Sequence, residues 1–385
     1  MVSAFTAIST IGAALAILAG VILSPIPRNL GLYRFLASKD LALVGLTPAF
    51  HHGIEWQYSY EKLYENCSKE IKGQTALITG ANSGVGYETA RALAKCGVHV
   101  TMACRNAKRC AAAGNKIMEE LKNDGLFVED ENHIETMIVD TSSLKSVQKF
   151  SQEYLQKQSD AGSGALDMLY LNAGIASSNM SKNEPLVLSE DGIELVFATN
   201  YVGHHLMYKL LEPLLQKSKM ARVIQTSSVA SFDTFDHKVA TSLDVLNDPS
   251  VPMPKYAMQY YGQSKLAQIL WSKHLTNRLG DNSTIYVNAC HPGAVNTFIW
   301  DKIIGIPTPI MVIVNYVRKH IIWTSEEGAL TQLYLGVATS ELIAKDIRGK
   351  YFHPQVQEVV NPLSLDEKLQ VELWKFSDEL VSKFL

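Results

Sequence analysis

A tyrosine and a lysine four residues apart mark a place where this chain could move a proton. Tyr261 and Lys265 lie in a segment with a helical pattern, so this spacing puts both side chains on one face. A lysine cation beside a phenol lowers the pKa of the phenol, which makes Tyr261 a better acid–base group near neutral pH. Ser228 follows a short apolar run and is placed to hydrogen-bond a substrate carbonyl. One such pair is expected by chance in a chain with 16 tyrosines, so the interpretation needs further motifs.

A glycine-rich turn supplies one of them. The apolar run 75–79 leads directly into this turn, and a helical pattern follows it. Glycines permit a tight turn close to a pyrophosphate, and the N-terminus of the helix supplies N–H groups and partial positive charge. The strand–turn–helix context therefore predicts a dinucleotide site. Its expected residues are Gly80, Asn82, Ser83, Gly84, Val85 and Gly86.

Arg105 follows the second expected strand, where such sites distinguish between the two nicotinamide cofactors. An acidic residue there binds the ribose 2′-hydroxyl of NAD, whereas a cation accepts the 2′-phosphate of NADP. Arg105 can pair with a phosphate in bidentate fashion, and Lys108 lies nearby, so the sequence favours NADP(H). Asp140, after the third strand, either accepts a hydrogen bond from the adenine amino group or caps the next helix.

Strand and helix patterns alternate from residue 73 onward. The expected strands are 75–79, 98–103, 134–139, 166–171, 222–226 and 284–289, and the expected helices are 87–95, 107–121, 144–156, 195–215 and 261–279. This alternation predicts an α/β fold of the Rossmann type, a doubly wound parallel sheet with helices on both faces. A last helix is expected after a capping box formed by Ser364 and Glu367. It carries a core-facing stripe: Leu369, Leu373, Phe376, Leu380 and Phe384.

The composition excludes several classes of protein. The 385 residues carry 35 Lys and Arg against 38 Asp and Glu, so no basic excess suggests nucleic acid as a partner. Hydrophobic residues make up 47% of the chain, which excludes a disordered protein. Charged residues make up only 19%, below the ~25% of an average soluble domain, which hints at membrane contact.

Cysteines and histidines predict neither a disulfide framework nor a metal site. The five cysteines are odd in number and contain no C-x-x-C pair, which indicates a reducing compartment for the catalytic part. Cys96, Cys104 and Cys110 are expected as small buried residues. The pairs His51–His52 and His204–His205 have no third ligand at metal spacing, so both are interpreted as structural or surface residues.

The N-terminus predicts attachment to a membrane. Residues 1–27 carry no charge, and the stretch 3–23 is long enough to span a bilayer. A cleaved signal peptide is less favoured because no basic residue precedes the apolar stretch, and a buried hydrophobic helix is the other alternative. Basic residues follow the stretch, which by the positive-inside rule keeps the rest of the chain in the cytosol. These are Arg28, Arg34 and Lys39.

Three parts follow from this pattern: a membrane anchor over 1–27, a juxtamembrane connector over 28–72 and a single catalytic domain over 73–385. The connector contains aromatic residues throughout, among them Tyr58, Tyr60 and Tyr64. Such rings suit a membrane–water interface, and they also suit packing against a neighbouring domain.

The motifs together resemble the short-chain dehydrogenase/reductase family over roughly residues 73–353. They occur in the order of that family, each beside an expected strand or helix. The set comprises the glycine-rich turn, Asn172-Ala173-Gly174, Asn200, Ser227-Ser228, the Tyr261/Lys265 pair and Pro292-Gly293.

The resemblance implies a role for each residue of the catalytic set. Tyr261 would donate or accept the proton, and Ser228 would polarise the carbonyl. Lys265 would lower the pKa of Tyr261 and bind the nicotinamide ribose. Asn200 would hold a water molecule in a proton relay.

The resemblance also implies further cofactor contacts and a subunit arrangement. Asn172, Ala173 and Gly174 would support the sheet near the adenine ribose. Pro292 and Gly293 begin the segment that faces the nicotinamide, with Val295 and Thr297 as contacts of the carboxamide. Members of the family often form dimers through the helices that carry Asn200 and Tyr261, so a homodimer is one expectation.

Within the family, the segments 103–106, 264–267 and 291–293 are most similar to the branch of retinol dehydrogenases and WW domain-containing oxidoreductases. That branch includes membrane-attached enzymes that use NADP(H) on lipophilic alcohols, aldehydes and ketones. An anchor in the endoplasmic reticulum or another organelle membrane, with the catalytic domain facing the cytosol, is therefore expected. Two departures stand out: Leu171 replaces an asparagine of the branch, and an inserted loop lengthens the chain between Ser228 and Tyr261.

Several alternatives remain at this point. The apolar segment 303–316 suits a lid over a lipophilic substrate such as a retinoid, steroid or fatty aldehyde, or an ordinary buried helix. A sterol ketoreductase and an enzyme like protochlorophyllide reductase are the enzymatic alternatives, although the latter expects a cysteine shortly after Lys265, where Leu266-Ala267-Gln268 stands. A membrane-tethered NADPH sensor without activity is the third.

Overall fold

A single mixed sheet organises the molecule. The computed structural model describes residues 58–127, 134–160, 162, 164–176, 186–232, 234, 239–248, 258–293, 295 and 323–385. Within these residues the strand order is β3-β2-β1-β4-β5-β6-β7-β8, where β1 to β7 run parallel and β8 pairs antiparallel with β7. The strands are β1 Thr75–Thr79, β2 His99–Cys104, β3 Ile134–Ile138, β4 Met168–Leu171, β5 Ala221–Thr226, β6 Ile285–Cys290, β7 Tyr351–His353 and β8 Gln357–Glu358. The expected Rossmann-type parallel sheet is confirmed.

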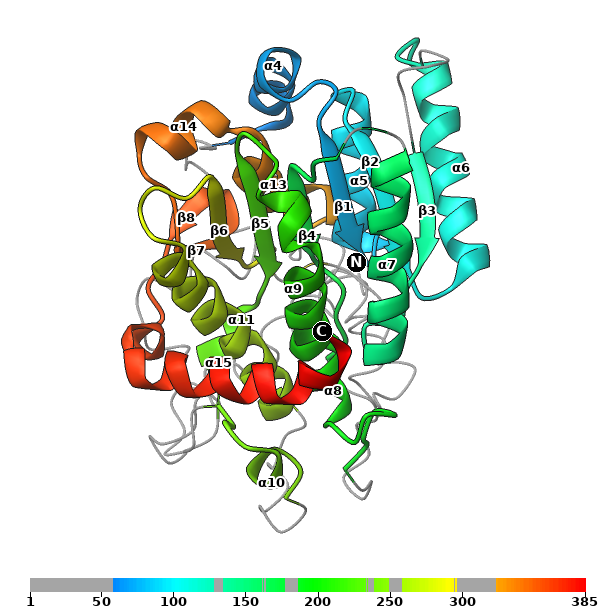
Figure 1. Cartoon of the computed structure of the whole chain (residues 1–385). Helices are drawn as coiled ribbons and strands as arrows, with labels where there is room; N and C mark the ends of the chain where they lie inside the picture. Colours follow the sequence, from blue (N-terminus) through cyan, green and yellow to red (C-terminus); the bar gives the residue numbers. More distant parts are fainter. Residues whose placement is uncertain are drawn as a thin grey trace, which may run out of the picture. The chain divides into compact units, whose positions relative to one another are not determined.

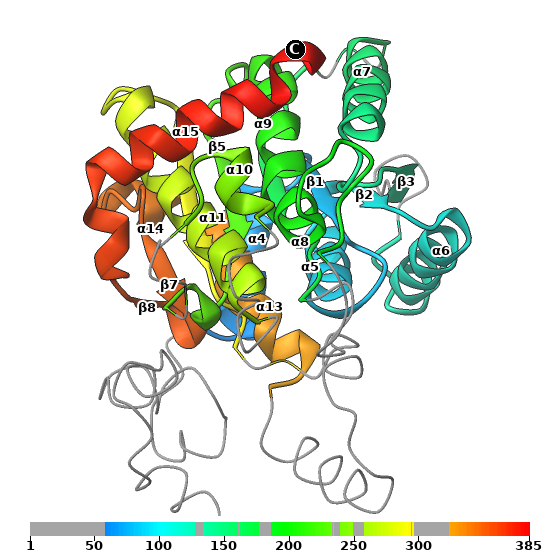
Figure 2. The same cartoon turned by 90° about the horizontal axis from the view of Figure 1, so that it is seen from below.

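Helices cover both faces of the sheet (Figures 1 and 2). One apolar core lies under α4 Tyr60–Glu70, α5 Gly84–Lys95, α6 Ala107–Asn123, α13 Ser325–Val337 and α14 Thr339–Ala344. The other lies under α7 Leu144–Asp160, α9 Gly203–Leu215, α11 Met258–Leu279 and α15 Glu367–Val381. Two short helices, α8 Leu195–Phe197 and α10 Leu243–Leu246, lie near the start of the α9 and α11 segments. The strands β1, β2, β4, β5 and β6 are buried on both faces, which explains their largely apolar runs in the sequence, whereas the outer strand β3 is only partly buried.

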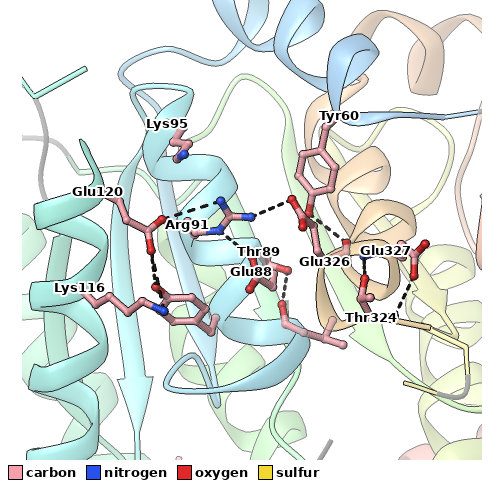
Figure 3. A network of polar contacts seen from close by, with 12 residues as sticks. Tyr60, Glu88, Thr89, Arg91, Lys95, Lys116, Glu120, Thr324, Glu326 and Glu327 are labelled. Carbon is pink, nitrogen blue, oxygen red and sulfur yellow. Dashed lines mark hydrogen bonds and ion pairs between the residues drawn. The ribbon is translucent and has the colours of Figure 1, made fainter. Parts of the chain in front are cut away.

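A polar network joins the helices of the first face (Figure 3). Arg91 on α5 pairs with Glu88 on the same helix at 2.7 Å and with Glu326 on α13 at 3.0 Å. Glu120 on α6 lies 3.8 Å from the same guanidinium. The hydroxyl of Tyr60 on α4 donates to the backbone carbonyl of Glu326 at 3.0 Å. One half-buried arginine therefore contacts three helices, and α4 joins through the α13 backbone.

The described end of the connector packs on the catalytic domain. Tyr58 is 1% exposed, and its ring meets the ring of Tyr334 edge-on at 5.2 Å. Tyr60 is held by its bond to α13. Of the two interpretations of the connector aromatics, packing against a neighbouring domain therefore applies to Tyr58 and Tyr60.

The C-terminal helix α15 begins differently from the expectation. Its N-cap is Asp366, whose carboxylate accepts from the N–H of Leu369 at 3.0 Å. Ser364 lies in a preceding 3₁₀ turn and donates to the carbonyl of Asn361, so the expected capping box with Glu367 was wrong. An aspartate one residue before the helix competes successfully for the same N–H groups. The apolar stripe is confirmed as a core face, because Leu369, Leu373 and Phe376 are buried.

Two disulfides contradict the expectation drawn from cysteine spacing. Cys67 of α4 is bonded to Cys96 at the end of α5, with the Cα atoms 5.2 Å apart. Cys104 at the end of β2 is bonded to Cys110 in the first turn of α6, with the Cα atoms 5.9 Å apart. Both Cα distances suit a disulfide. Sequence spacing does not predict these two disulfides, because the fold, rather than a short motif, brings the paired cysteines together.

The expected anchor at 1–27 and the apolar segment 303–316 lie outside the described residues. Among the helices that are described, none is both long enough and apolar enough to cross a membrane.

Candidate active site

The glycine-rich turn joins β1 to α5 with the backbone that the sequence predicts. Gly80 has φ +69° and Gly84 has φ +60°, values that side chains other than glycine rarely adopt. A Cβ at Gly86 would lie 2.5 Å from the carbonyl of Gly80, so no larger residue fits there. Ser83 is the N-cap of α5, and its hydroxyl makes no capping bond. The first N–H groups of α5 are thus not capped by that side chain, as suits a helix that binds an anion.

The other residues of the turn complete its shape. Asn82 is half-buried and Ser83 is exposed, while Val85 is buried against α13 at the position of Gly328. The turn therefore presents a polar surface outward and an apolar one toward the core.

The segment Asn172–Gly174 is tied to the start of this turn. The side-chain amide of Asn172 donates to the carbonyl of Thr79 at 2.8 Å. The N–H groups of Asn172 and Ala173 both donate to the hydroxyl of Thr79 at 2.9 Å. The chain after β4 is thereby fixed to the end of β1, on the edge of the sheet where the dinucleotide turn lies.

Cations gather where the second strand ends. Arg105, Lys108 and Arg109 are all exposed, and the side chain of Asn106 caps α6 by accepting from the N–H of Arg109 at 3.0 Å. An exposed guanidinium at the start of a helix fits a phosphate group on chemical grounds.

Asp140 does not cap the helix that follows it. One oxygen of its carboxylate accepts from the N–H and the hydroxyl of Ser142, at 2.9 and 2.6 Å. The first N–H of α7, that of Leu144, donates instead to Asp191 at 2.8 Å. The capping alternative for Asp140 was therefore wrong, and the contact with an adenine amino group stays a prediction.

The structure brings the three expected catalytic side chains together. Ser228, just after β5, lies near Tyr261, in the first turn of α11, and acts on the pKa of its phenol. The ammonium of Lys265 lies 5.3 Å from the ring centre of Tyr261 and donates to the carbonyl of Thr226 at 2.6 Å. The hydroxyl of Ser227 donates to the carbonyl of Lys265 at 2.7 Å, which ties α11 to the end of β5.

Burial changes the electrostatics that the sequence predicts for this set. It raises the pKa of Tyr261 to about 12, although the hydrogen bond from Ser228 lowers that pKa somewhat. Burial also lowers the pKa of Lys265 to about 7, with a small opposing effect of Cys290. The expected lowering of the Tyr261 pKa by Lys265 is not found in the protein without ligands, because desolvation raises this pKa and no effect of Lys265 opposes it.

Asn200 lies in a π-helical turn, Ala198–Val202, between α8 and α9. Its side-chain amide donates to Ser264 on α11 and to the carbonyl of Ile175, both at 2.9 Å. Its Oδ1 accepts from the N–H of Ile175 at 2.8 Å. A Cβ at Gly174 would lie 3.2 Å from this oxygen and 3.4 Å from the nitrogen of Lys265. Asn200, Gly174 and Lys265 thus share one small space, and π-turns are frequent at functional sites.

The segment expected to face a nicotinamide is described in part. Gly293 has φ +89°, and a Cβ on it would lie 2.6 Å from the ring of Trp323. Pro292 precedes it after β6, and Val295 forms a parallel bridge with Trp323. Thr297 lies outside the described residues.

Sequence reasoning missed a buried polar chain behind Lys265. The hydroxyl of Thr226 donates to Gln332 on α13 at 2.9 Å, and Gln332 donates to Thr89 on α5. No motif marks Gln332. The helix that carries it had a usable signal, because Thr324 and Glu327 form a complete capping box at its start.

This arrangement can bind a dinucleotide and hold a proton donor beside it. The comparisons with known proteins agree with that chemistry. The family model of short chain dehydrogenases matches residues 74–242. Human retinol dehydrogenase 14 is 33% identical over 317 residues, which cover 81% of this chain and 87% of that protein. The chicken WW domain-containing oxidoreductase is 31% identical over 318 residues, which cover 82% of this chain and 70% of that protein.

Solved structures agree with the architecture. The crystal structure of an uncharacterised protein from Mycobacterium paratuberculosis is similar with a TM-score of 0.58 and 26% identity, covering 82% of this chain and 97% of that one. A short chain dehydrogenase of Shigella flexneri 2a, crystallised with NADP, is similar with a TM-score of 0.53 and 19% identity. The similarity covers 74% of this chain and 98% of that one. At that identity the second likeness shows the fold alone.

Proposed function

Since this chain belongs to the short-chain dehydrogenase/reductase family and is an oxidoreductase related to retinol dehydrogenases, we propose that it interconverts a lipophilic alcohol and its aldehyde or ketone with NADP(H). The observation that carries this proposal is the contact of Ser228 and Tyr261 beside Lys265. A set lacking the tyrosine or the lysine would have favoured a cofactor sensor.

The preference for NADP(H) rests on the end of β2. Arg105, Lys108 and Arg109 are exposed there, and Cys104 replaces the acidic residue that would bind the ribose hydroxyl of NAD. The Shigella structure with NADP supports the proposal only as a relative in fold. Gly80, Gly84 and Gly86 would approach the pyrophosphate, and the start of α5 would meet its charge.

The side chains divide the chemistry between them. When bound, the nicotinamide supplies or takes up the hydride. Ser228 would hydrogen-bond the substrate oxygen next to Tyr261. Because burial raises its pKa to about 12, Tyr261 is protonated at neutral pH and can donate a proton to a developing alkoxide. Lys265, held by Thr226, would place its positive charge beside that phenol and the ribose.

Membrane attachment is also part of the proposal. The uncharged residues 1–27 and the basic residues after them support an anchor in the endoplasmic reticulum or another organelle membrane, with the catalytic domain in the cytosol. The two disulfides oppose the cytosolic side, because such bonds are rare in a reducing compartment. Such a location would bring the site close to a lipophilic substrate of the retinoid, steroid or fatty aldehyde type. Expression of a fusion with a fluorescent protein, followed by protease protection, tests the location and the orientation.

A homodimer remains a proposal, and α15 restricts its form. Trp374 and Asp378 of α15 both contact His205 on α9, and the hydroxyl groups of Tyr201 and Ser377 lie 2.7 Å apart. α15 thus packs on the segment that carries Asn200, so a dimer through this face would include α15. Light scattering on the detergent-solubilised protein measures the oligomeric state directly.

The first experiment is a cofactor oxidation assay with the full chain in detergent. Retinal, steroid ketones and long-chain aldehydes are each offered with NADPH or with NADH. Turnover that requires NADPH on one of these classes supports the proposal and names the substrate class. Tight NADPH binding without turnover on any of them would contradict it and favour the sensor.

A further inference from the structure

His204 lies between the dinucleotide turn and the catalytic asparagine. It sits on α9, is 0% exposed and has one polar contact at each ring nitrogen. Nδ1 lies 2.9 Å from the backbone carbonyl of Asn200, and Nε2 lies 3.0 Å from the hydroxyl of Thr79. From sequence spacing, this histidine has only a structural or surface role. Its contacts instead place it on a direct path from the end of β1 to Asn200.

The partners of His204 determine which of its nitrogens carries the hydrogen. Burial lowers the pKa of His204 to about 3, and the charge of Lys265 acts in the same direction, so the ring is neutral. A carbonyl oxygen can only accept, and therefore Nδ1 donates to Asn200. Nε2 then accepts from the hydroxyl of Thr79, whose one hydrogen it shares with the carbonyl of Tyr170 at 3.2 Å. The lone pairs of that hydroxyl take up the N–H groups of Asn172 and Ala173.

The hydrogen bonds of Asn200 leave it little freedom. Its backbone carbonyl accepts one hydrogen bond from the ring of His204 and another from the side-chain amide of Gln268, the latter at 2.8 Å. Both hydrogens of its side-chain amide are used, by Ile175 and Ser264. Oδ1 accepts one bond from Ile175, which leaves one lone pair at the atom that faces Gly174 and Lys265.

We infer that His204 is a positioning residue for the proton relay: its Nδ1–H holds the Asn200 carbonyl so that the free lone pair of Oδ1 stays directed at the space beside Lys265. The inference deepens the proposed function and rests on it. The second contact, from Thr79, couples the same ring to the turn that would bind the pyrophosphate. His204 touches no reacting atom and acts only through Asn200.

Three substitutions separate the two contacts. His204→Asn keeps an amide donor at the position of Nδ1 but cannot reach Thr79. His204→Gln places its polar atoms farther out, near Thr79, and loses the short donor to Asn200. His204→Phe removes both.

We expect His204→Asn to keep kcat within about threefold of wild type. His204→Gln and His204→Phe should lower kcat by roughly ten- to a hundredfold, which is the scale of misplaced catalytic groups. The NADPH Kd should change by less than about threefold in all three.

His205 supplies a matched control on the same helix. It is equally buried, but it bonds Asp378 and Trp271 and contacts neither Asn200 nor Thr79. His205→Phe should lower the thermal midpoint as His204→Phe does, while leaving kcat near the wild-type value. Equal losses of kcat in His204→Asn and His204→Phe, or no loss in any of the three variants, would overturn the inference.

A readout independent of turnover keeps this test separate from the proposed function. In protein labelled with ¹⁵N-histidine, His204 is assigned as the signal lost in His204→Asn. We expect a neutral ring protonated at Nδ1 that does not titrate between pH 5 and 9. A ring protonated at Nε2, or one that titrates near its ordinary pKa, would refute the inference even if no substrate were turned over. Failure of wild-type turnover alone would count against the proposed function only.

Discussion

The ammonium of Lys265 donates to the backbone carbonyl of Thr226 at 2.6 Å, at the point where β5 ends. The lysine is thus held by a neutral peptide group and is 3% exposed. With no full charge to compensate its burial, its pKa falls to about 7. The same residue, Thr226, uses its hydroxyl to bond Gln332 on the opposite face of the sheet. The position of the cation therefore depends on packing from both layers.

The lowered pKa of Lys265 predicts a pH dependence for carbonyl reduction. Above about pH 7 the free enzyme loses the ammonium charge, whereas Tyr261 keeps its proton up to about pH 12. We therefore expect kcat/KM for NADPH, which reports groups of the free enzyme, to fall as the pH rises through about 7. Arginine stays charged throughout this range, so Lys265→Arg should be slower but show no such fall below pH 9. A flat wild-type profile across pH 6–9 would contradict the assignment.

Tyr261 should be essential for turnover and unimportant for cofactor affinity. Removing its hydroxyl takes away the proton donor, for which a loss of about a hundred- to ten-thousandfold in kcat is expected. NADPH binding by Tyr261→Phe, measured by fluorescence titration, should stay close to wild type. The neighbouring Tyr260 is buried but lacks a lysine four residues later, so Tyr260→Phe is the matched control and should retain activity. Equal activities of the two variants would show that another group donates the proton.

Reversing the charge at Arg105 should change the choice of cofactor. Hydrogen bonds to charged groups are worth about 1.5–3 kcal/mol, so Arg105→Glu should reduce the preference for NADPH over NADH by roughly ten- to a hundredfold or more. Lys122→Glu makes the same charge change at the far end of α6 and should leave the preference unaltered. The ratio of kcat/KM values for the two cofactors is the measurement. An unchanged ratio in Arg105→Glu would remove the basis for the NADP(H) assignment.

Gly174 should be needed for its lack of a side chain. A methyl group there would lie 3.2 Å from Oδ1 of Asn200 and 3.4 Å from Nζ of Lys265. These contacts are tight, and they fill the space in which the two polar atoms face each other. Gly174→Ala should therefore lower kcat by about tenfold or more, the scale expected for misplaced catalytic groups, with a smaller effect on the NADPH Kd. Wild-type kcat in this variant would show that the space is not used.

The sheet could be predicted from the sequence because each strand has its own apolar pattern within a few consecutive residues. Buried parallel strands leave continuous apolar runs, and all six expected strands are present with bounds shifted by two residues at most. β7 and β8 were not predicted, since three and two residues are too short to leave a pattern. The helix α13 also lacks a polar face, because most of it is buried between the sheet and α5, and so its apolar periodicity is weak.

The site could be predicted as a set of residue types but not as an electrostatic environment. Spacing identified Ser228, Tyr261 and Lys265, which the structure places in contact. The pKa values depend on burial, which the sequence does not specify, and so the direction for Tyr261 was wrong. The bond between Cys104 and Cys110 and the contacts of His204 depend likewise on neighbours that only the fold brings close.

The buried carboxyl group of Glu194 should make the stability of the fold depend on pH. It is 3% exposed, and it caps α8 by accepting from the N–H groups of Val196 and Phe197 at 2.9 and 2.7 Å. Burial raises its pKa from 4.5 to about 7, more than those two bonds lower it. Between these values the native state holds a proton that the unfolded state has lost. The free energy of unfolding should therefore fall as the pH rises from about 4.5 to 7.

A substitution isolates this contribution. Glu194→Gln keeps an acceptor for one of the two N–H groups and cannot titrate, so its stability should change less over the same pH range. Urea unfolding of both proteins at pH 5, 6, 7 and 8 gives the difference directly. Because the proton is lost as the pH rises through about 7, wild type should lose stability relative to the variant on going from pH 5 to 8. Parallel pH profiles for the two proteins would show that Glu194 is already ionised in the folded chain at pH 5.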